Sequence, residues 1–152
     1  MLRKTLLTLA ATLLLAASAF AQDAQPPANA AAPAEQTLLS ESVSLEVLDG
    51  SIIPEDCQYP ATLADTARFE LACVTMPRFV GGELAAAYIG QLGEQGWQQG
   101  AYITGGITAV RTDENNCENV LNIFPGDFPP GTARSDIVVI WFARERAPRC
   151  PA

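Results

Sequence analysis

The chain has 152 residues and a formal net charge of −8, with 17 acidic residues against nine Lys and Arg and with no His. A chain of this length has room for one domain around one hydrophobic core. Its acidic balance argues against nucleic acid and anionic lipid as partners, because like charges repel.

The first residues resemble an export signal. Arg3 and Lys4 precede the uncharged apolar run Thr5–Ala17, and Ala19–Ala21 reads Ala-Phe-Ala. A basic start, a short apolar run and a small-x-small site are typical of a cleaved secretory signal peptide. The run is shorter than the ~20 residues of a membrane-spanning helix. We therefore predict a signal peptide over residues 1–21, no membrane span after cleavage, and a periplasmic or secreted protein.

Loss of this segment changes the chemistry that is available. It removes Arg3 and the only Lys, Lys4, so nine basic residues become seven and the net charge becomes −10. Without His or Lys the usual general base, the Ser–His, Cys–His and Ser–Lys pairs, and Schiff-base catalysis are all absent. We expect a protein that is not an enzyme and has no cofactor.

The chain after the signal peptide divides into a tether and a domain. Gln22–Gln36 is rich in Ala and Pro and has little to bury, which predicts disorder. We assign residues 22–37 to a disordered tether and residues 38–152 to a single domain. At the start of this domain, Ser42–Leu48 alternates apolar and polar residues, which predicts a half-buried strand.

A strand and a helix are expected next. Arg68–Thr75 alternates again and is stopped by Pro77. Leu84, Tyr88 and Leu92 then recur every four residues, which is typical of a core-facing helix, and Ala85 and Ile89 are expected beside this stripe. We expect Gly81-Gly82 to form the turn and cap in front of this helix.

The end of the helix is marked by glycine and tryptophan. Gly96 stands where a left-handed C-terminal cap is expected, and Trp97 follows where an apolar side chain folds back onto the last turn. Gly90 and Gly93 each cost about 0.5–1 kcal/mol relative to Ala, which suggests close approach of the helix to a sheet. We favour packing over a ligand platform as the role of Trp97.

The remainder of the chain has the period-two pattern of strands. The expected strands are Trp97–Thr104, Ile107–Thr112, Glu118–Phe124 and Ile137–Ala143. Gly105-Gly106 is a hairpin-turn signal. The last segment is almost continuously apolar, which favours a central strand or one buried on both faces. The fold expected is α+β, with one helix packed on an antiparallel sheet of about five to six strands and stapled by disulfides.

One family resemblance follows from these elements. The sequence from Leu92 to Trp97 reads L-x-x-x-G-W and precedes a meander of predicted strands. It resembles small secreted or periplasmic bacterial domains of unknown function, over about Thr66–Arg144. The resemblance implies a helix laid on an antiparallel sheet, and it carries over no functional residue.

Four cysteines remain in the exported chain: Cys57, Cys73, Cys117 and Cys150. An even number in an oxidising compartment predicts two disulfides. Of the three possible pairings we favour Cys57–Cys73 and Cys117–Cys150. The chain has no C-x-x-C, and a cysteine-only zinc site would need paired spacings that are missing, so no metal site is expected.

Two other clusters of side chains are candidate sites, and each also has a simple structural interpretation. Asp113, Glu114 and Glu118 cluster at one turn and could serve a carboxylate-dependent hydrolase, but a solvated hairpin turn is favoured. Asp113, Asn115 and Glu118 are oxygen donors, but Cys117 and Glu118 break the EF-hand pattern, so bound calcium is not expected.

The Pro- and Gly-rich loop Pro125–Asp136 is the remaining candidate. Phe124, Phe128 and Arg134 lie in or beside it and form a possible partner-binding tip. The leading hypothesis is thus an exported envelope module that binds an unknown envelope protein or a small ligand. The alternatives are a small hydrolase of envelope glycans and a structural or stress-related secreted protein.

Overall fold

The computed structural model describes residues 36–39, 43–132 and 135–151. The expected signal peptide, and the expected tether up to residue 35, lie outside these ranges. Within them, no helix is both long and apolar enough to cross a membrane.

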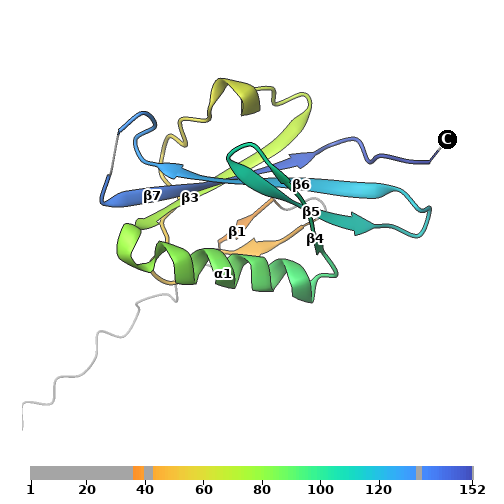
Figure 1. The fold of residues 1–152 in the computed structure, drawn as a ribbon, viewed down its shortest axis with the longest axis horizontal. Helices are drawn as coiled ribbons and strands as arrows, with labels where there is room; N and C mark the ends of the chain where they lie inside the picture. Colours follow the sequence, from red (N-terminus) through yellow and green to blue (C-terminus); the bar gives the residue numbers. More distant parts are fainter. Residues whose placement is uncertain (1–35, 40–42, 133–134, 152) are drawn as a thin grey trace, which may run out of the picture. The chain divides into compact units, whose positions relative to one another are not determined.

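A five-stranded antiparallel sheet and one long helix form the fold (Figure 1). The strand order is β3-β7-β6-β5-β4. The strands are β3 (Phe69–Pro77), β4 (Gln98–Ile103), β5 (Gly106–Thr112), β6 (Glu118–Asp127) and β7 (Ile137–Glu145). Helix α1 (Arg78–Glu94) packs on one face, beside a small ribbon of β1 (Thr37–Leu38) and β2 (Leu45–Glu46). The predicted α+β fold, with a helix on an antiparallel sheet, is confirmed.

Strand β7 is an interior strand, as its apolar run predicted. It lies between β3 and β6, and its residues from Val139 to Arg144 are buried. Ile140 and Phe142 pack into the core under α1, whereas Val139 and Trp141 pack into a second cluster with Phe69 and Cys73. Successive side chains of a strand point to opposite faces, so a strand covered on both sides needs apolar residues throughout.

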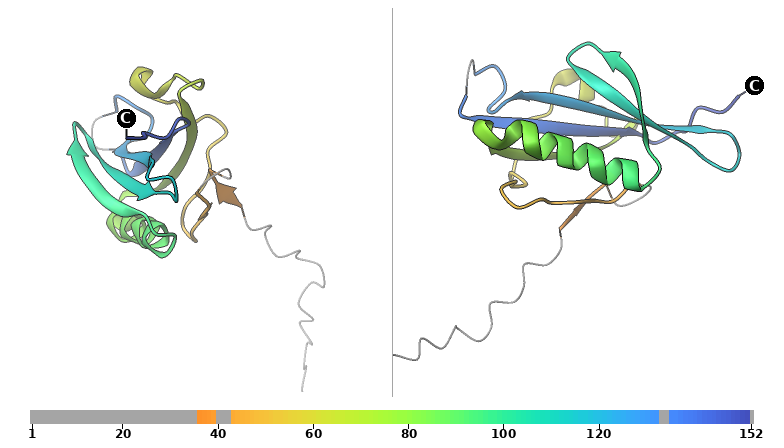
Figure 2. Two further views of the ribbon diagram at one scale, coloured as in Figure 1. Left: turned by 90° about the vertical axis from the view of Figure 1, so that its right-hand side faces the viewer. Right: turned by 60° about the horizontal axis from the view of Figure 1, so that its bottom comes forward.

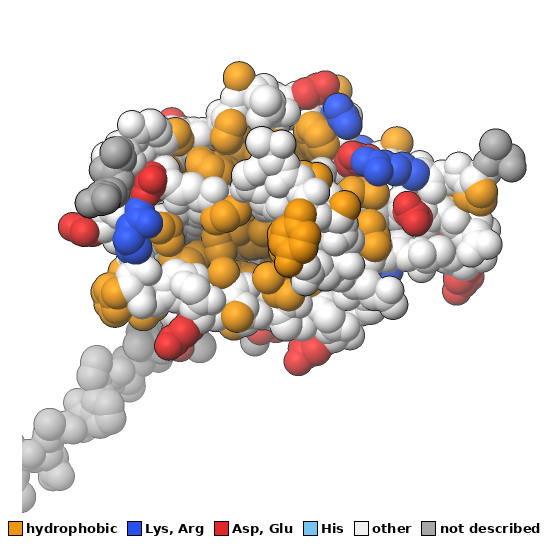
Figure 3. All heavy atoms as spheres, viewed as in Figure 1, with side chains coloured by type: hydrophobic (Ala, Val, Ile, Leu, Met, Phe, Trp, Pro, Cys, Tyr) orange, Lys and Arg blue, Asp and Glu red, His pale blue; other side chains and the backbone are white. Residues whose placement is uncertain are grey.

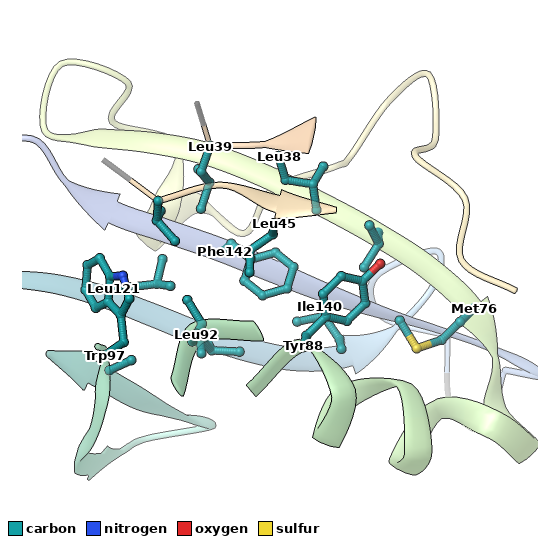
Figure 4. Close-up of a cluster of buried hydrophobic side chains, with 14 residues drawn as sticks. Leu38, Leu39, Leu45, Met76, Tyr88, Leu92, Trp97, Leu121, Ile140 and Phe142 are labelled. Atoms are coloured by element: carbon teal, nitrogen blue, oxygen red, sulfur yellow. The ribbon is translucent and has the colours of Figure 1, made fainter. Parts of the chain in front are cut away.

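The main core lies between α1, the β1–β2 ribbon and the sheet (Figure 4). Tyr88 and Leu92 are buried from the helix side, and the Tyr88 ring meets Phe142 edge to face at 5.6 Å between centroids. Leu84 is partly buried against the same cluster. Ile89, expected beside this stripe, is 42 % exposed, so the core-facing stripe is narrower than predicted.

The helix begins earlier than predicted. Pro77 is its N-cap, with φ −59° and ψ 136°, and Arg78 is its first residue. Gly81-Gly82 therefore lies inside the helix, and the expectation of a turn there was wrong. Gly81 allows α1 to approach β7, because a Cβ at that position would lie 2.9 Å from Cγ2 of Val138.

The end of the helix is formed as predicted. Gly96 has φ +81°, its N–H donates to the carbonyl of Gly93 at 3.0 Å, and the N–H of Trp97 donates to the carbonyl of Leu92 at 3.0 Å. This pair of bonds is the Schellman motif, and Trp97 and Leu92 are buried in the same cluster. The expectation for Gly90 and Gly93 was wrong, since a Cβ at either position would meet nothing within 4 Å.

The segment Ser42–Leu48 is not a strand of the main sheet. Its described residues contribute only the two-residue β2, which pairs with β1. The predicted alternation of burial is nevertheless confirmed, since Val43 and Leu45 are buried and Ser44 and Glu46 are exposed. The side-chain amides of Gln91 in α1 and of its C-cap residue Gln95 bond to the backbone of this segment in place of a further strand.

The hairpin turn and the end of β6 also differ from prediction. The turn is Thr104-Gly105, because Gly106 already pairs with Ile103. Strand β6 continues through Pro125 to Asp127, so the predicted Pro125–Asp136 loop is shorter by three residues. Proline is compatible with this position because β5 pairs with β6 only as far as Ile123.

Both favoured disulfides are present. Cys57 bonds Cys73 with 5.9 Å between Cα atoms, and Cys117 bonds Cys150 with 4.1 Å. The first attaches a loop to β3 on the sheet face that α1 does not cover, where Leu63 is buried. The second joins the residue before β6 to the C-terminal segment.

Candidate functional site

An apolar pocket lies between α1, the turn of the β4–β5 hairpin and the floor of the sheet. We call it the α1–hairpin pocket; its volume is about 240 Å³. It is lined by Ala85, Tyr88, Ile89, Gly105, Gly106, Ile107, Ile123, Pro125, Ile140 and Phe142. In Figure 3 hydrophobic side chains gather in a hollow near the centre of this face.

The pocket exists because the sheet narrows at this place. Strand β5 begins at Gly106, which lies so close to β6 that a Cβ would be 2.9 Å from Cδ1 of Phe124. Gly105, with φ +78°, lies in the turn that joins β4 to β5. Figure 2 shows the hairpin diverging from β6 toward this turn. In the described part of the chain, the last residues of β6 thus have β7 as their one neighbouring strand, and space opens between β6 and α1.

The pocket continues toward the start of the helix as a groove. A second hollow of about 410 Å³ shares Ala85, Pro125 and Ile140 with the pocket. We call the two hollows together the α1–β6 groove. The second hollow is lined by Arg78, Gly81, Gly82, Ala85, Pro125, Gly126, Asp127, Val138, Val139 and Ile140.

Among the described lining residues, the charged groups lie at the far end of this groove. The guanidinium of Arg78 forms an ion pair with the carboxylate of Asp127, and its Nε donates to the carbonyl of Ser135 at 2.6 Å. The α1–hairpin pocket itself has one polar side-chain group in its lining, the hydroxyl of Tyr88. That oxygen accepts a hydrogen bond of 3.1 Å from the N–H of Leu48. The pocket is therefore suited to holding an apolar group rather than to acid–base chemistry.

The predicted acidic cluster lies away from the pocket. Asp113, Glu114 and Glu118 are exposed at the end of β5 opposite to its hairpin turn. Oδ1 of Asp113 accepts hydrogen bonds from the backbone N–H of Asn115 at 2.8 Å and of Cys117 at 3.0 Å. Asp113 thus organises the turn that precedes a disulfide. Among the residues that the structure describes, no group of three His, Cys, Asp or Glu side chains is placed to hold a metal ion.

The described aromatic residues of the predicted partner-binding loop are only partly exposed. Phe124 and Phe128 are half-buried and pack against the second cluster, and the hydroxyl of Ser135 donates to the carbonyl of Phe128 at 2.6 Å. Arg134 lies outside the described residues. The partner-binding role of this loop stays a prediction.

Trp97 is a core residue. Its side chain is 4 % exposed, and the guanidinium of Arg111 lies 5.1 Å from the centre of the ring. The packing interpretation of this tryptophan is confirmed. Sequence reasoning missed Ala85, Ile89 and Ile107 as pocket residues, although an apolar residue at the margin of a helix stripe, such as Ile89, was a usable signal.

Comparison with known proteins returned no match, whether with protein-family models, with curated proteins or with solved structures. The resemblance of the L-x-x-x-G-W helix to small exported domains therefore stays a prediction. Function has to be inferred from the chemistry of the pocket and from the disulfides.

Proposed function

We propose that this protein is an exported, non-enzymatic binding module of the cell envelope, whose ligand inserts one apolar group into the α1–hairpin pocket. Two disulfides support export, because such bonds persist in oxidising compartments. The basic and apolar start of the chain, with Ala-Phe-Ala at 19–21, supports a cleaved signal peptide.

The composition of the pocket lining carries this proposal. Nine of the ten lining residues have no polar side-chain atom, and the tenth, Tyr88, uses its hydroxyl within the fold. Burial of apolar surface contributes roughly 25 cal/mol per Å² to binding. A described lining with no carboxylate, amine, imidazole or thiol, and with its one hydroxyl bonded within the fold, favours binding over catalysis as the function of the pocket.

The size of the pocket limits what can enter it. Its volume of about 240 Å³ exceeds the ~150 Å³ cavity that holds benzene. It is smaller than the ~300 Å³ at which sites for drug-sized ligands begin. A single ring or branched aliphatic side chain fits, which favours an anchor group that belongs to a larger ligand.

Exposed apolar side chains next to the pocket support the same role. Ile89 lines the pocket and is 42 % exposed, and Tyr102, which pairs with the pocket residue Ile107, is 80 % exposed. Apolar surface around a concave site is typical of a binding region.

The isoleucines of the chain provide a direct test. Toluene is titrated into protein labelled at the Ile δ1 methyl groups, and methyl NMR shifts are followed. We expect saturable shifts at the four pocket isoleucines: Ile89, Ile107, Ile123 and Ile140. The other four isoleucines of the chain serve as internal controls: Ile52, Ile53, Ile103 and Ile137.

A matched pair of helix variants completes the test. Ala85→Leu fills the pocket and should abolish the shifts, whereas Ala87→Leu adds the same side chain at an exposed helix position outside the lining and should preserve them. Equal shifts at all eight isoleucines, or shifts that survive Ala85→Leu, would reject the pocket as the site.

A further inference from the structure

We propose that the ligand is an extended segment of a partner polypeptide, which lies in the α1–β6 groove and pairs its backbone with the open edge of β6. This inference rests on the function proposed for the α1–hairpin pocket and deepens it. An apolar side chain of the segment fills the pocket, and a basic side chain lies near Asp127 and Asp136.

The open edge follows from the register of the sheet. The β5–β6 ladder ends at the pair Ile107 and Ile123, whereas the β6–β7 ladder continues to Asp127 and Val138. Beyond Ile123, β6 therefore has a paired side and, within the described part of the chain, a side without a neighbouring strand.

The alternation of an antiparallel ladder shows which groups face that side. The N–H of Phe128 donates to the carbonyl of Ile137 at 3.1 Å, so Phe128 directs its backbone groups toward β7. In a strand, alternate residues direct these groups to opposite neighbours. Pro125 and Asp127 accordingly face the open side, where they offer two carbonyl acceptors and the N–H of Asp127.

This arrangement suits recognition by strand addition. In that mode, main-chain hydrogen bonds supply affinity and pockets for alternate side chains supply specificity. The absence of an N–H at Pro125 fits an edge position. From Ile123 to Asp127 the edge spans about 13 Å at roughly 3.3 Å per residue, which corresponds to about four or five residues of an added segment.

Charge favours a basic partner over a second copy of this chain. Among the described residues near the start of α1, the carboxylates of Asp127 and Asp136 outnumber the guanidinium of Arg78. Without residues 1–21 the chain carries a net charge of −10, so two copies repel each other, whereas a cationic segment is attracted. Beyond Arg78, Phe79 and Ile137 are 87 % and 46 % exposed and extend the apolar surface available to it.

The first test selects peptides from a random library of about 12 residues displayed on phage. The protein without its signal peptide is the target, and Ala85→Leu is the counter-selection target. We expect enriched sequences with apolar residues at alternate positions and a Lys or Arg within about four residues of them. Enrichment of apolar residues at i, i+3 and i+4 would instead indicate a helical ligand and reject strand addition.

The second test examines the backbone of the strongest synthetic binder. N-methylation at the positions whose N–H faces β6 should weaken binding by at least about tenfold, and N-methylation at the intervening positions by less than about twofold. Binding should also slow amide hydrogen exchange at Asp127. Equal tolerance of N-methylation at both sets of positions would overturn the proposal.

The outcomes separate this inference from the function on which it rests. If no peptide is enriched while toluene still shifts the four pocket isoleucines, the pocket stands and the extended segment is rejected. If toluene causes no shifts either, the proposed function fails as well. Concentration-dependent self-association that Ala85→Leu abolishes would replace the partner segment with a second copy.

Discussion

The indole N–H of Trp141 donates a hydrogen bond of 3.0 Å to the backbone carbonyl of Cys57. The loop around Cys57 is therefore attached to the sheet twice, once through Trp141 on β7 and once through the disulfide to Cys73 on β3. Leu63 and Tyr59 of this loop pack over the second core cluster. The disulfide thus keeps one face of β7 covered.

Removal of the two disulfides should therefore have different structural consequences. In the chain-entropy model, separations of 16 and 33 residues correspond to about 3 and about 4 kcal/mol of unfolding free energy. We expect the double substitution Cys57→Ala and Cys73→Ala to expose Trp141 in addition. The double substitution Cys117→Ala and Cys150→Ala should lower stability without exposing Trp141.

Urea unfolding and acrylamide quenching measure these two effects. Both variants are made in protein that also carries Trp97→Phe, so that Trp141 is its only tryptophan. Increased quenching at low urea is expected only for the Cys57 and Cys73 variant. The same quenching in both variants would show that the disulfide does not hold the loop over Trp141.

The glycines of α1 should respond in opposite directions to one substitution. Gly90→Ala and Gly93→Ala place a Cβ in open space, so each should raise the unfolding free energy by about 0.5–1 kcal/mol. Gly81→Ala places a Cβ 2.9 Å from Cγ2 of Val138, and overpacking of this kind costs about 1–3 kcal/mol. Urea midpoints at constant m-value measure all three. Stabilisation by Gly81→Ala would show that the Val138 side chain of β7 moves to accommodate the added methyl group.

Features that depend on neighbours in sequence were predictable. The cap at Gly96 and Trp97 is a local hydrogen-bond pattern, and the apolar run of β7 reports burial of both faces directly. Features that are set by residues distant in sequence were not predictable. Pro125 can lie in β6 because the pairing of β6 with β5 stops at Ile123. Helix α1 begins at Arg78 although glycines follow within its first turns.

The candidate site belongs to the second kind. Its walls come from α1, from the hairpin turn at Gly105 and from strands β6 and β7, which are brought together only by the fold. The sequence drew attention instead to Phe128 and to the acids around Asp113, which are conspicuous in a local window. An open pocket has no local signature, because it results from where a neighbouring strand stops.

Tyr59 should make stability depend on alkaline pH. Burial raises the pKa of its hydroxyl above the ordinary value of 10.0. The unfolded chain therefore loses this proton at lower pH than the folded chain, so the folded state binds more protons and stability falls as pH rises above about 10. Below that pH the contribution is constant. In urea unfolding between about pH 8 and pH 11, Tyr59→Phe should reduce the alkaline loss; an equal loss in both proteins would contradict this role.

Two glutamines, Gln91 of α1 and its C-cap residue Gln95, hold the N-terminal segment as a neighbouring strand would. The amide of Gln91 accepts from the N–H of Glu46 at 2.8 Å and donates to its carbonyl at 3.2 Å. The amide of Gln95 does the same for Ser44, at 3.1 Å and 2.6 Å. Four hydrogen bonds between side chains and backbone thus satisfy this edge of the segment.

Replacement of both glutamines should release this edge while the main sheet stays folded. Each hydrogen bond contributes about 0.5–1.5 kcal/mol net, and Ser44 and Glu46 are exposed, so water replaces part of the loss. We expect Gln91→Ala with Gln95→Ala to speed amide exchange at Ser44 and Glu46 by at least about tenfold. Gln98→Ala, at an exposed position of β4, is the control and should leave both rates unchanged. Unchanged exchange in the double variant would mean that burial of Val43 and Leu45 and the bond from Leu48 to Tyr88 hold the segment against α1 without the glutamines.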